Sequence, residues 1–260
     1  MGHIHLGVLP NSRKWKEVVA LLTDGAARED VVAASAAAAE RELLAAVRDP
    51  VFVEAVRLLA TVPAAARSED FGQALRDADI PIQGTPDLLG LVTAVGQRLD
   101  EVARNRASPS DIGEISRRAL LSTLSIHIGD ELPGLFETTP HDVQRAAALL
   151  SGSRSFASYT RSFFNRLVSE ALRSWLDRTL SAQVGLDRRF SGTAERAAFD
   201  MALAQYSSEA TRIIREFAGG WYGKTLHREG RIDATQAATF GSVCFRKITE
   251  ELRVTRGSDA

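Results

Sequence analysis

One segment near the C-terminus has the residue types and the spacing of a phosphate-binding loop. Residues 218–225 read Ala-Gly-Gly-Trp-Tyr-Gly-Lys-Thr, which fits the pattern if alanine is allowed at the first glycine position. In such a loop, backbone N–H groups hold the phosphates, a lysine contacts the terminal phosphates and a hydroxyl binds Mg²⁺. Gly223, Lys224 and Thr225 are therefore candidate phosphate-loop residues.

The sequence around these glycines favours another structure. A phosphate-binding loop follows a buried strand, whereas the chain from Thr193 to Phe217 has the spacing of one long amphipathic helix. Residues 226–231 have the polar composition of a loop. We expect Gly219 and Gly220 to end the helix in a tight turn, with the next two aromatic residues packed on the core.

Histidine and acidic residues form a second candidate site. His141 and Asp142 are adjacent, and His127 lies one segment upstream. Adjacent His and Asp side chains can both reach a metal ion that activates water for hydrolysis. However, Pro140 places the pair in the first turn of a helix, where Asp142 would compensate the helix dipole. The sequence does not provide a second set of ligands, and no cofactor is predicted.

Arginine and aromatic residues are interleaved between residues 154 and 190, as in some anion-binding or nucleic-acid-binding surfaces. The candidate contacts are Arg154, Arg161, Arg188 and Arg189, together with Lys224. At about 100° per residue, the arginines of this segment do not form one stripe on a helix. Arg166 and Arg173 also have acidic partners four residues later. A core helix with ion pairs on its outer face is the favoured interpretation.

The elements that would position these residues are predicted to be helices. A small polar residue precedes proline at 49–50, 85–86, 108–109 and 139–140, a pattern typical of helix starts, and Asp233 and Gln236 have the spacing of a capping box. The fold class is therefore all-α, an irregular bundle of about ten helices, with a short extended segment at residues 3–9. The expected helices are 12–24, 29–48, 50–61, 69–78, 86–105, 110–128, 140–151, 155–184, 193–218 and 234–253.

Composition limits the class of protein. The formal net charge is −1, and the single cysteine, Cys244, excludes an internal disulfide and cysteine-rich metal sites. Lysine occurs at four positions, so 28 of the 32 basic residues are arginine, which indicates a GC-rich bacterial genome. No apolar run could span a membrane, and no signal peptide is recognisable, so a cytoplasmic protein is expected.

Aromatic residues are unevenly distributed along the chain. Four precede residue 150 and thirteen follow it, while residues 26–66 are rich in alanine. This predicts an alanine-rich helical half over residues 1–150 and an aromatic-rich half over 151–260, or one continuous domain. The Ser-Gly-Ser run at 151–153 is the candidate seam.

Each candidate catalytic site lacks part of what its chemistry requires, so the balance favours a non-catalytic protein. We expect a bacterial helical interaction protein, an accessory subunit that assembles with a protein partner or with itself through its helical surface. One alternative is a nucleotide-binding or nucleic-acid-binding module that uses the arginine and aromatic segment 154–190. The other is a metal-dependent or phosphate-loop enzyme.

Overall fold

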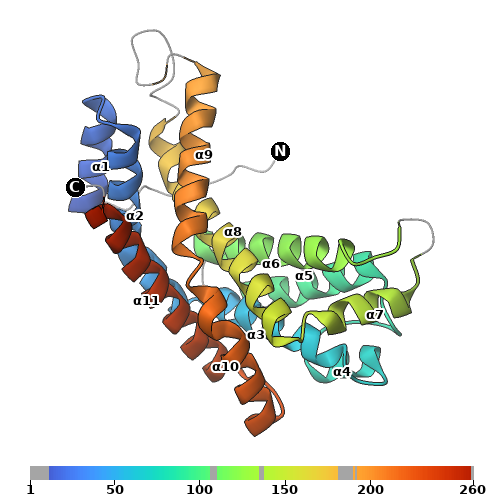
Figure 1. The fold of residues 1–260 in the computed structure, drawn as a ribbon. Coiled ribbons are helices and arrows are strands. Elements are labelled where there is room, and N and C mark those ends of the chain that lie inside the picture. The colour runs from blue at the N-terminus through green and yellow to red at the C-terminus, as the bar shows by residue number, and fades with distance from the viewer. Residues whose placement is uncertain (1–11, 106–109, 135–137, 181–189, 191, 259–260) are drawn as a thin grey trace. The chain divides into compact units, whose positions relative to one another are not determined.

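The computed structural model describes residues 12–105, 110–134, 138–180, 190 and 192–258. Within these ranges the chain forms eleven α-helices and one short 3₁₀ helix, without a β-strand (Figure 1). The all-α prediction is confirmed. The predicted extended segment 3–9 lies outside the described residues, as do Arg188 and Arg189.

The helices follow the predicted order closely. Their bounds are α1 Arg13–Thr23, α2 Arg28–Ala45, η1 Ala46–Arg48, α3 Pro50–Ala65, α4 Phe71–Asp77, α5 Leu88–Arg104, α6 Asp111–Gly129, α7 Pro140–Leu149, α8 Ser153–Leu180, α9 Thr193–Ala210, α10 Ile214–Glu229 and α11 Ala234–Ser258. Over the described residues, none of them combines the length and apolar character needed to cross a membrane.

The predicted helix starts are partly confirmed. Asp49 caps α3 and Thr139 caps α7, each followed by proline, and Asp233 and Gln236 form the predicted reciprocal bonds at the start of α11. Helix α5 begins at Leu88, after Pro86, and α6 begins at Asp111, while the predicted start at Ser108 and Pro109 lies outside the described residues. The caps there are Asp87 and Ser110, whose side chains accept the N–H of Gly90 and Gly113. When two capping residues flank a proline, the sequence pattern alone does not choose between them.

The predicted continuous helix 193–218 is wrong. Helix α9 ends at Ala210, and a new helix, α10, begins at Ile214. At the break the buried Thr211 hydroxyl bonds the carbonyls of Ser207 and Ser208, at 2.9 and 3.1 Å. Side-chain bonds of this kind compete with the regular helix ladder and favour a bend or an end.

Helix α10 also contradicts the predicted glycine turn and the predicted polar loop at 226–231. Gly219 faces the first residue of α8, and a Cβ at position 219 would overlap the backbone carbonyl of Ser153. The glycine therefore permits a close approach of two helices and does not terminate one. The left-handed glycine that follows α10 is Gly230, with φ of 70°.

The contacts divide the chain into two compact units. The first contains residues 1–45, 165–213 and 245–260, and the second contains 46–164 and 214–244. Helices α8 and α11 are thus each shared between the units. The Ser-Gly-Ser run at 151–153 lies between α7 and α8 and within the second unit. The division at residue 150 into an alanine-rich and an aromatic-rich half stays a prediction.

The first unit packs around tryptophan and alanine. Trp15 on α1 meets Trp175 on α8 edge to face, with ring centroids 5.8 Å apart. The alanines of α2 that are buried are Ala34, Ala36, Ala38 and Ala39. Because these side chains are already covered, this part of the alanine-rich segment is not available to a partner helix.

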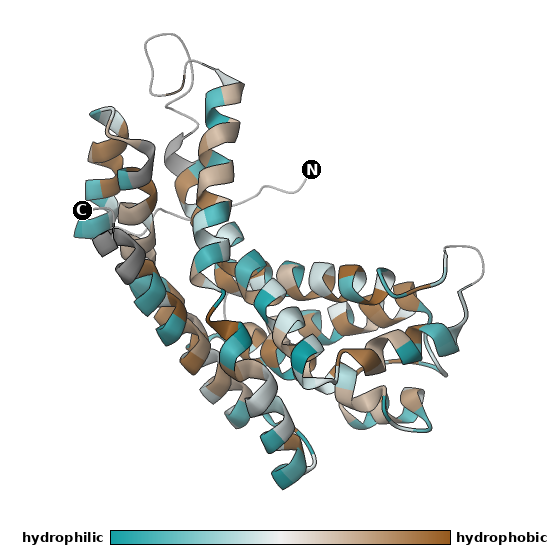
Figure 2. Cartoon of the chain, viewed as in Figure 1, coloured by the Kyte–Doolittle hydropathy of each residue, from teal (hydrophilic) through white to brown (hydrophobic). Residues whose placement is uncertain are grey.

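The second unit packs around aromatic rings. Phe164 on α8 meets Phe52 on α3 and Phe240 on α11, at centroid distances of 6.4 and 6.5 Å. Tyr222 on α10 stacks on Phe156 at 3.9 Å. Figure 2 shows hydrophobic and hydrophilic residues on different sides of individual helices, as amphipathic packing requires. These contacts join α3, α8, α10 and α11.

Candidate functional site

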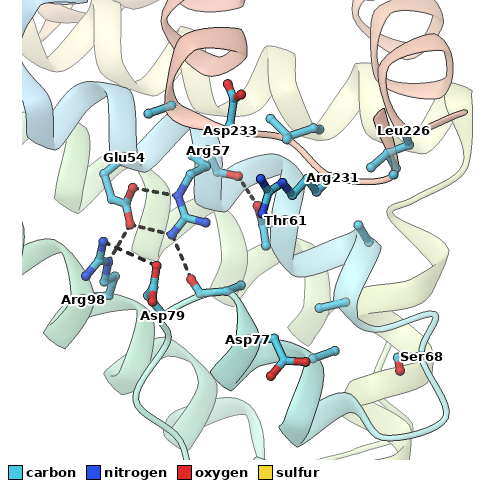
Figure 3. A pocket seen from close by; sticks show the side chains of 17 residues that line it. Glu54, Arg57, Thr61, Ser68, Asp77, Asp79, Arg98, Leu226, Arg231 and Asp233 are labelled. Carbon is cyan, nitrogen blue, oxygen red and sulfur yellow. Dashed lines mark hydrogen bonds and ion pairs between the residues drawn. The ribbon is translucent and has the colours of Figure 1, made fainter. Parts of the chain in front are cut away.

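A cleft of about 700 Å³ opens on the second unit (Figure 3). Helices α3, α4 and α5 supply part of its wall, and the end of α10, the following loop and the first residue of α11 supply the rest. Its charged lining residues come from distant parts of the sequence and differ sharply in exposure. We call the three inner ones, Glu54, Arg57 and Arg98, the cleft floor. We call the four exposed ones, Asp77, Asp79, Arg231 and Asp233, the cleft rim.

Glu54 is the centre of the cleft floor and is only 6% exposed. Arg57, one turn later on α3, donates to both of its carboxylate oxygens at 2.8 and 2.7 Å. Arg98 of α5 donates from Nε to the same carboxylate at 2.7 Å. One buried carboxylate thus holds two guanidinium groups and ties two helices together.

The floor fixes the protonation state of Glu54. Burial alone raises the pKa of the Glu54 carboxyl, but the hydrogen bonds and positive charges of Arg57 and Arg98 outweigh burial, and the net pKa is lowered. A general acid needs a raised pKa, and a carboxylate is a weaker nucleophile when cationic donors hold both of its oxygens. Glu54 is ionised and its oxygens accept three donors, so its chemistry here is ionic positioning.

Arg57 is held from a second side as well. Its Nη2 also donates to the carbonyl of Ala78 at 2.9 Å, at the C-terminal end of α4, where a positive charge is favoured by the helix dipole. The Nε and Nη2 atoms of Arg57 therefore already donate to acceptors within the protein. Among the described residues, Nη1 of Arg57 has no hydrogen-bond partner, and its guanidinium borders the cleft.

Asp79 on the rim has an unusual backbone. Its φ is 62°, the left-handed region that glycine adopts most readily, and it is the one non-glycine residue with positive φ among the described residues. The turn closes α4 with bonds from Asp79 to the carbonyl of Arg76 and from Ile80 to that of Leu75. The carboxylate of Asp79 lies 4.0 Å from Nη2 of Arg98.

The phosphate-loop candidates are helical in the structure. Gly223, Lys224 and Thr225 lie within α10, where backbone N–H groups bond to carbonyls of the preceding turn and do not converge on a ligand. Lys224 is exposed, about 140° around the helix from Gly219, the residue that faces α8. The predicted packing of the neighbouring aromatics is confirmed, because Trp221 stacks on Phe240 at 3.8 Å and Tyr222 is buried.

The metal candidates are engaged in other contacts. His127 meets the Ser162 hydroxyl at 2.9 Å and the ring of Tyr159. Asp142 forms a capping box with Thr139 and an ion pair with Arg145, and the bonds from Thr139 contribute most to lowering its pKa. His141 is exposed. No group of three His, Cys, Asp or Glu residues suited to a metal ion occurs over the described part of the chain.

The remaining anion candidates occupy separate places. Arg154 is exposed at the start of α8, and Arg161, two turns later, is half-buried. The interpretation of this segment as a core helix is supported by Phe163, Phe164 and Leu167, which are fully buried. Cys244 is fully buried, and burial raises the pKa of its thiol.

Sequence reasoning missed the cleft. One signal was present, because Glu54 interrupts an otherwise apolar helix, and a charged residue at a core position requires a partner. Arg57, three residues later, was the local partner to expect. The approach of Arg98, 44 residues away, and of Arg231 depends on the tertiary fold.

Comparisons with protein families, with curated proteins and with solved structures gave no match for this chain.

Proposed function

We propose that this protein is a bacterial, cytoplasmic interaction protein, an accessory subunit that works by binding another protein chain or a second copy of itself through the cleft of the second unit. The observation that carries the proposal is the cleft floor. Buried ion pairs hold Arg57 and Arg98 in place, while the exposed rim stays open to a partner. Preformed polar groups of this kind lower the ordering cost of binding.

The protonation state of the floor supports binding over catalysis. Glu54 is ionised and shared by two guanidinium groups, which suits rigid recognition and does not suit proton transfer. The cleft has a volume of about 700 Å³, and its lining combines small apolar residues with charged groups. Such a surface can accept side chains of a partner.

A cleft-filling substitution tests this proposal. Ala64 lines the cleft and is half-buried, so Ala64→Tyr would occupy part of it without changing any charge. Ala103→Tyr on the exposed side of α5 is the matched control. We expect the tagged parent and Ala103→Tyr to co-purify with a stoichiometric partner from the native host, and Ala64→Tyr to lose it while keeping its thermal unfolding transition.

The proposal is wrong if the parent purifies as a monomer without a partner under native conditions. It is also wrong if the cleft-filling variant, shown to be folded, retains the partner as fully as the control does. Light scattering on the purified chain separates self-association from binding of another protein.

A further inference from the structure

The charges that line the cleft alternate across it. Figure 3 shows Asp233 on one side and Asp77 and Asp79 on the opposite side, with Arg57 and Arg231 between them. The acidic walls come from the end of α4 with the turn after it and from the loop before α11. Along the line from Asp233 through Arg231 to Asp77, the order of charge is negative, positive, negative, and the Glu54–Arg98 pair lies outside this line.

The central positive charge is available to a ligand. Arg57 is held by Glu54 and Ala78, which leaves Nη1 directed to the cleft, and Arg231 is exposed with no ion pair among the described residues. Glu54 is shared by the two arginines of the floor, and Arg98 has two further acidic partners in Asp79 and Glu101. Arg57 and Arg231 are therefore the cleft arginines that a ligand can contact. A carboxylate placed between Arg57 and Arg231 would complete this arrangement.

The acidic groups of the rim disfavour a purely acidic ligand. Asp77 accepts from the Gln73 amide at 2.7 Å, and Asp233 caps α11 by accepting the N–H of Gln236 at 2.8 Å. Both are exposed, and a ligand with several neighbouring carboxylates would meet these acidic side chains directly. Positive side chains on either side of the central carboxylate would instead pair with the two walls.

From this alternation we infer that the cleft binds a mixed-charge peptide segment of a partner protein, in which one Glu or Asp is flanked on both sides by Lys or Arg. This inference rests on the proposed function and specifies the partner's chemistry at the same site. The central carboxylate contacts Arg57 and Arg231, and the flanking cations contact Asp77 or Asp79 on one wall and Asp233 on the other.

The test uses defined peptides and the full-length protein. The probe is acetyl-Lys-Ala-Glu-Ala-Lys-amide, compared with peptides in which the glutamate is glutamine or both lysines are alanine. We expect the probe to bind with chemical-shift changes at the Arg57 side-chain N–H groups. Each altered peptide should bind about tenfold more weakly, as expected for the loss of a charge-assisted hydrogen bond.

Matched variants locate the contacts. Arg231→Gln should weaken the probe about tenfold. Arg228→Gln, an exposed arginine that does not line the cleft, should leave its affinity unchanged. Asp233→Asn keeps a good helix cap and removes the charge. It should therefore weaken binding of the probe but not binding of the peptide in which both lysines are alanine. Thermal unfolding of each variant verifies that it is folded.

Several results would overturn the inference. These are no binding of the probe, equal binding of the three peptides, or equal effects of Arg231→Gln and Arg228→Gln. Inorganic phosphate or single-stranded RNA that binds more tightly than the probe, with the same Arg231 dependence, would assign the cleft to another ligand class. If Ala64→Tyr loses the partner but none of the peptides binds, the proposed function is retained and the mixed-charge segment is rejected as the ligand.

Discussion

The cleft floor and the cleft rim contain the same kinds of charged group and differ in what those groups contact. On the floor, Glu54 is 6% exposed and accepts bonds from two arginines, so its charge is part of the packing. On the rim, Asp77, Arg231 and Asp233 are exposed and have only local partners or none among the described residues. We therefore expect the buried pairs of the floor to contribute to folding stability, whereas the proposed recognition uses the exposed rim together with the side of Arg57 that borders the cleft.

The largest effect on stability is expected at Glu54. Glu54→Gln removes the charge shared by two largely buried guanidinium groups, and breaking a buried pair from one side is strongly destabilising. We expect the free energy of unfolding to fall by about 3 kcal/mol in urea denaturation. Glu101→Gln, on an exposed partner of Arg98, should cost less than about 1 kcal/mol. Equal losses at both positions would remove the distinction between the buried floor and an exposed ion pair.

Two glycines of α10 provide a second comparison between a buried and an exposed position. A Cβ at Gly219 would overlap the backbone of Ser153, so Gly219→Ala should destabilise the protein by about 2 kcal/mol. Gly223 is exposed and its Cβ would meet no atom within 4 Å. Gly223→Ala should therefore stabilise the protein by about 0.5 kcal/mol, because glycine is unfavourable inside a helix. Thermal unfolding of both variants measures the difference, and a stabilising Gly219→Ala would contradict the close approach of α10 and α8.

We expect the protein to be less stable with the rim residue Asp79 than with glycine at the same position. Asp79→Gly relieves the left-handed backbone, and we expect a gain of about 1 kcal/mol in the free energy of unfolding. Its exposed pair with Arg98, at 4.0 Å, contributes little. Asp79→Asn is the control, since asparagine also tolerates this conformation, and should leave stability nearly unchanged. A less stable glycine variant would place Asp79 with the structural floor.

The smallest effect is expected in the pH dependence of stability. The folded pKa of Glu54 is lowered, so its contribution is fully present above the unfolded value of about 4.5 and is lost as the pH falls through the folded pKa. In urea denaturation, the free energy of unfolding of the parent should decline as the pH is lowered below about 4.5. The decline should be shallower for Glu54→Gln. Parallel curves for the two proteins would show that the folded carboxyl is not held ionised by its arginines.

Much of the fold was predictable because helix signals are local. The caps at Asp49, Thr139 and Asp233 and the apolar spacing between them gave the helix order and most boundaries. The break at Thr211 was missed because it depends on a side-chain bond inside an otherwise helical pattern. Gly219 was misread as a turn because a glycine required by a neighbouring helix has the same sequence signature as a glycine at a helix end.

The candidate site was less accessible to prediction than the fold. Glu54 and Arg57 are three residues apart and could be paired from the sequence, but Arg98, Arg231 and Asp233 join them only through tertiary packing. Conversely, Lys224 and Arg154 stood out in the sequence, and the structure places them on exposed helix surfaces outside the cleft. Local charge density therefore did not indicate where charges converge.

Site-specific photo-crosslinking in the native host tests the central claim most directly. A photoreactive phenylalanine analogue at Thr61, which lines the cleft, is compared with the same group at Lys224, exposed on α10. We predict a discrete adduct with a protein partner from position 61 and none from position 224. An adduct from position 224 alone, or none from position 61, would contradict the assignment of the cleft as the recognition site.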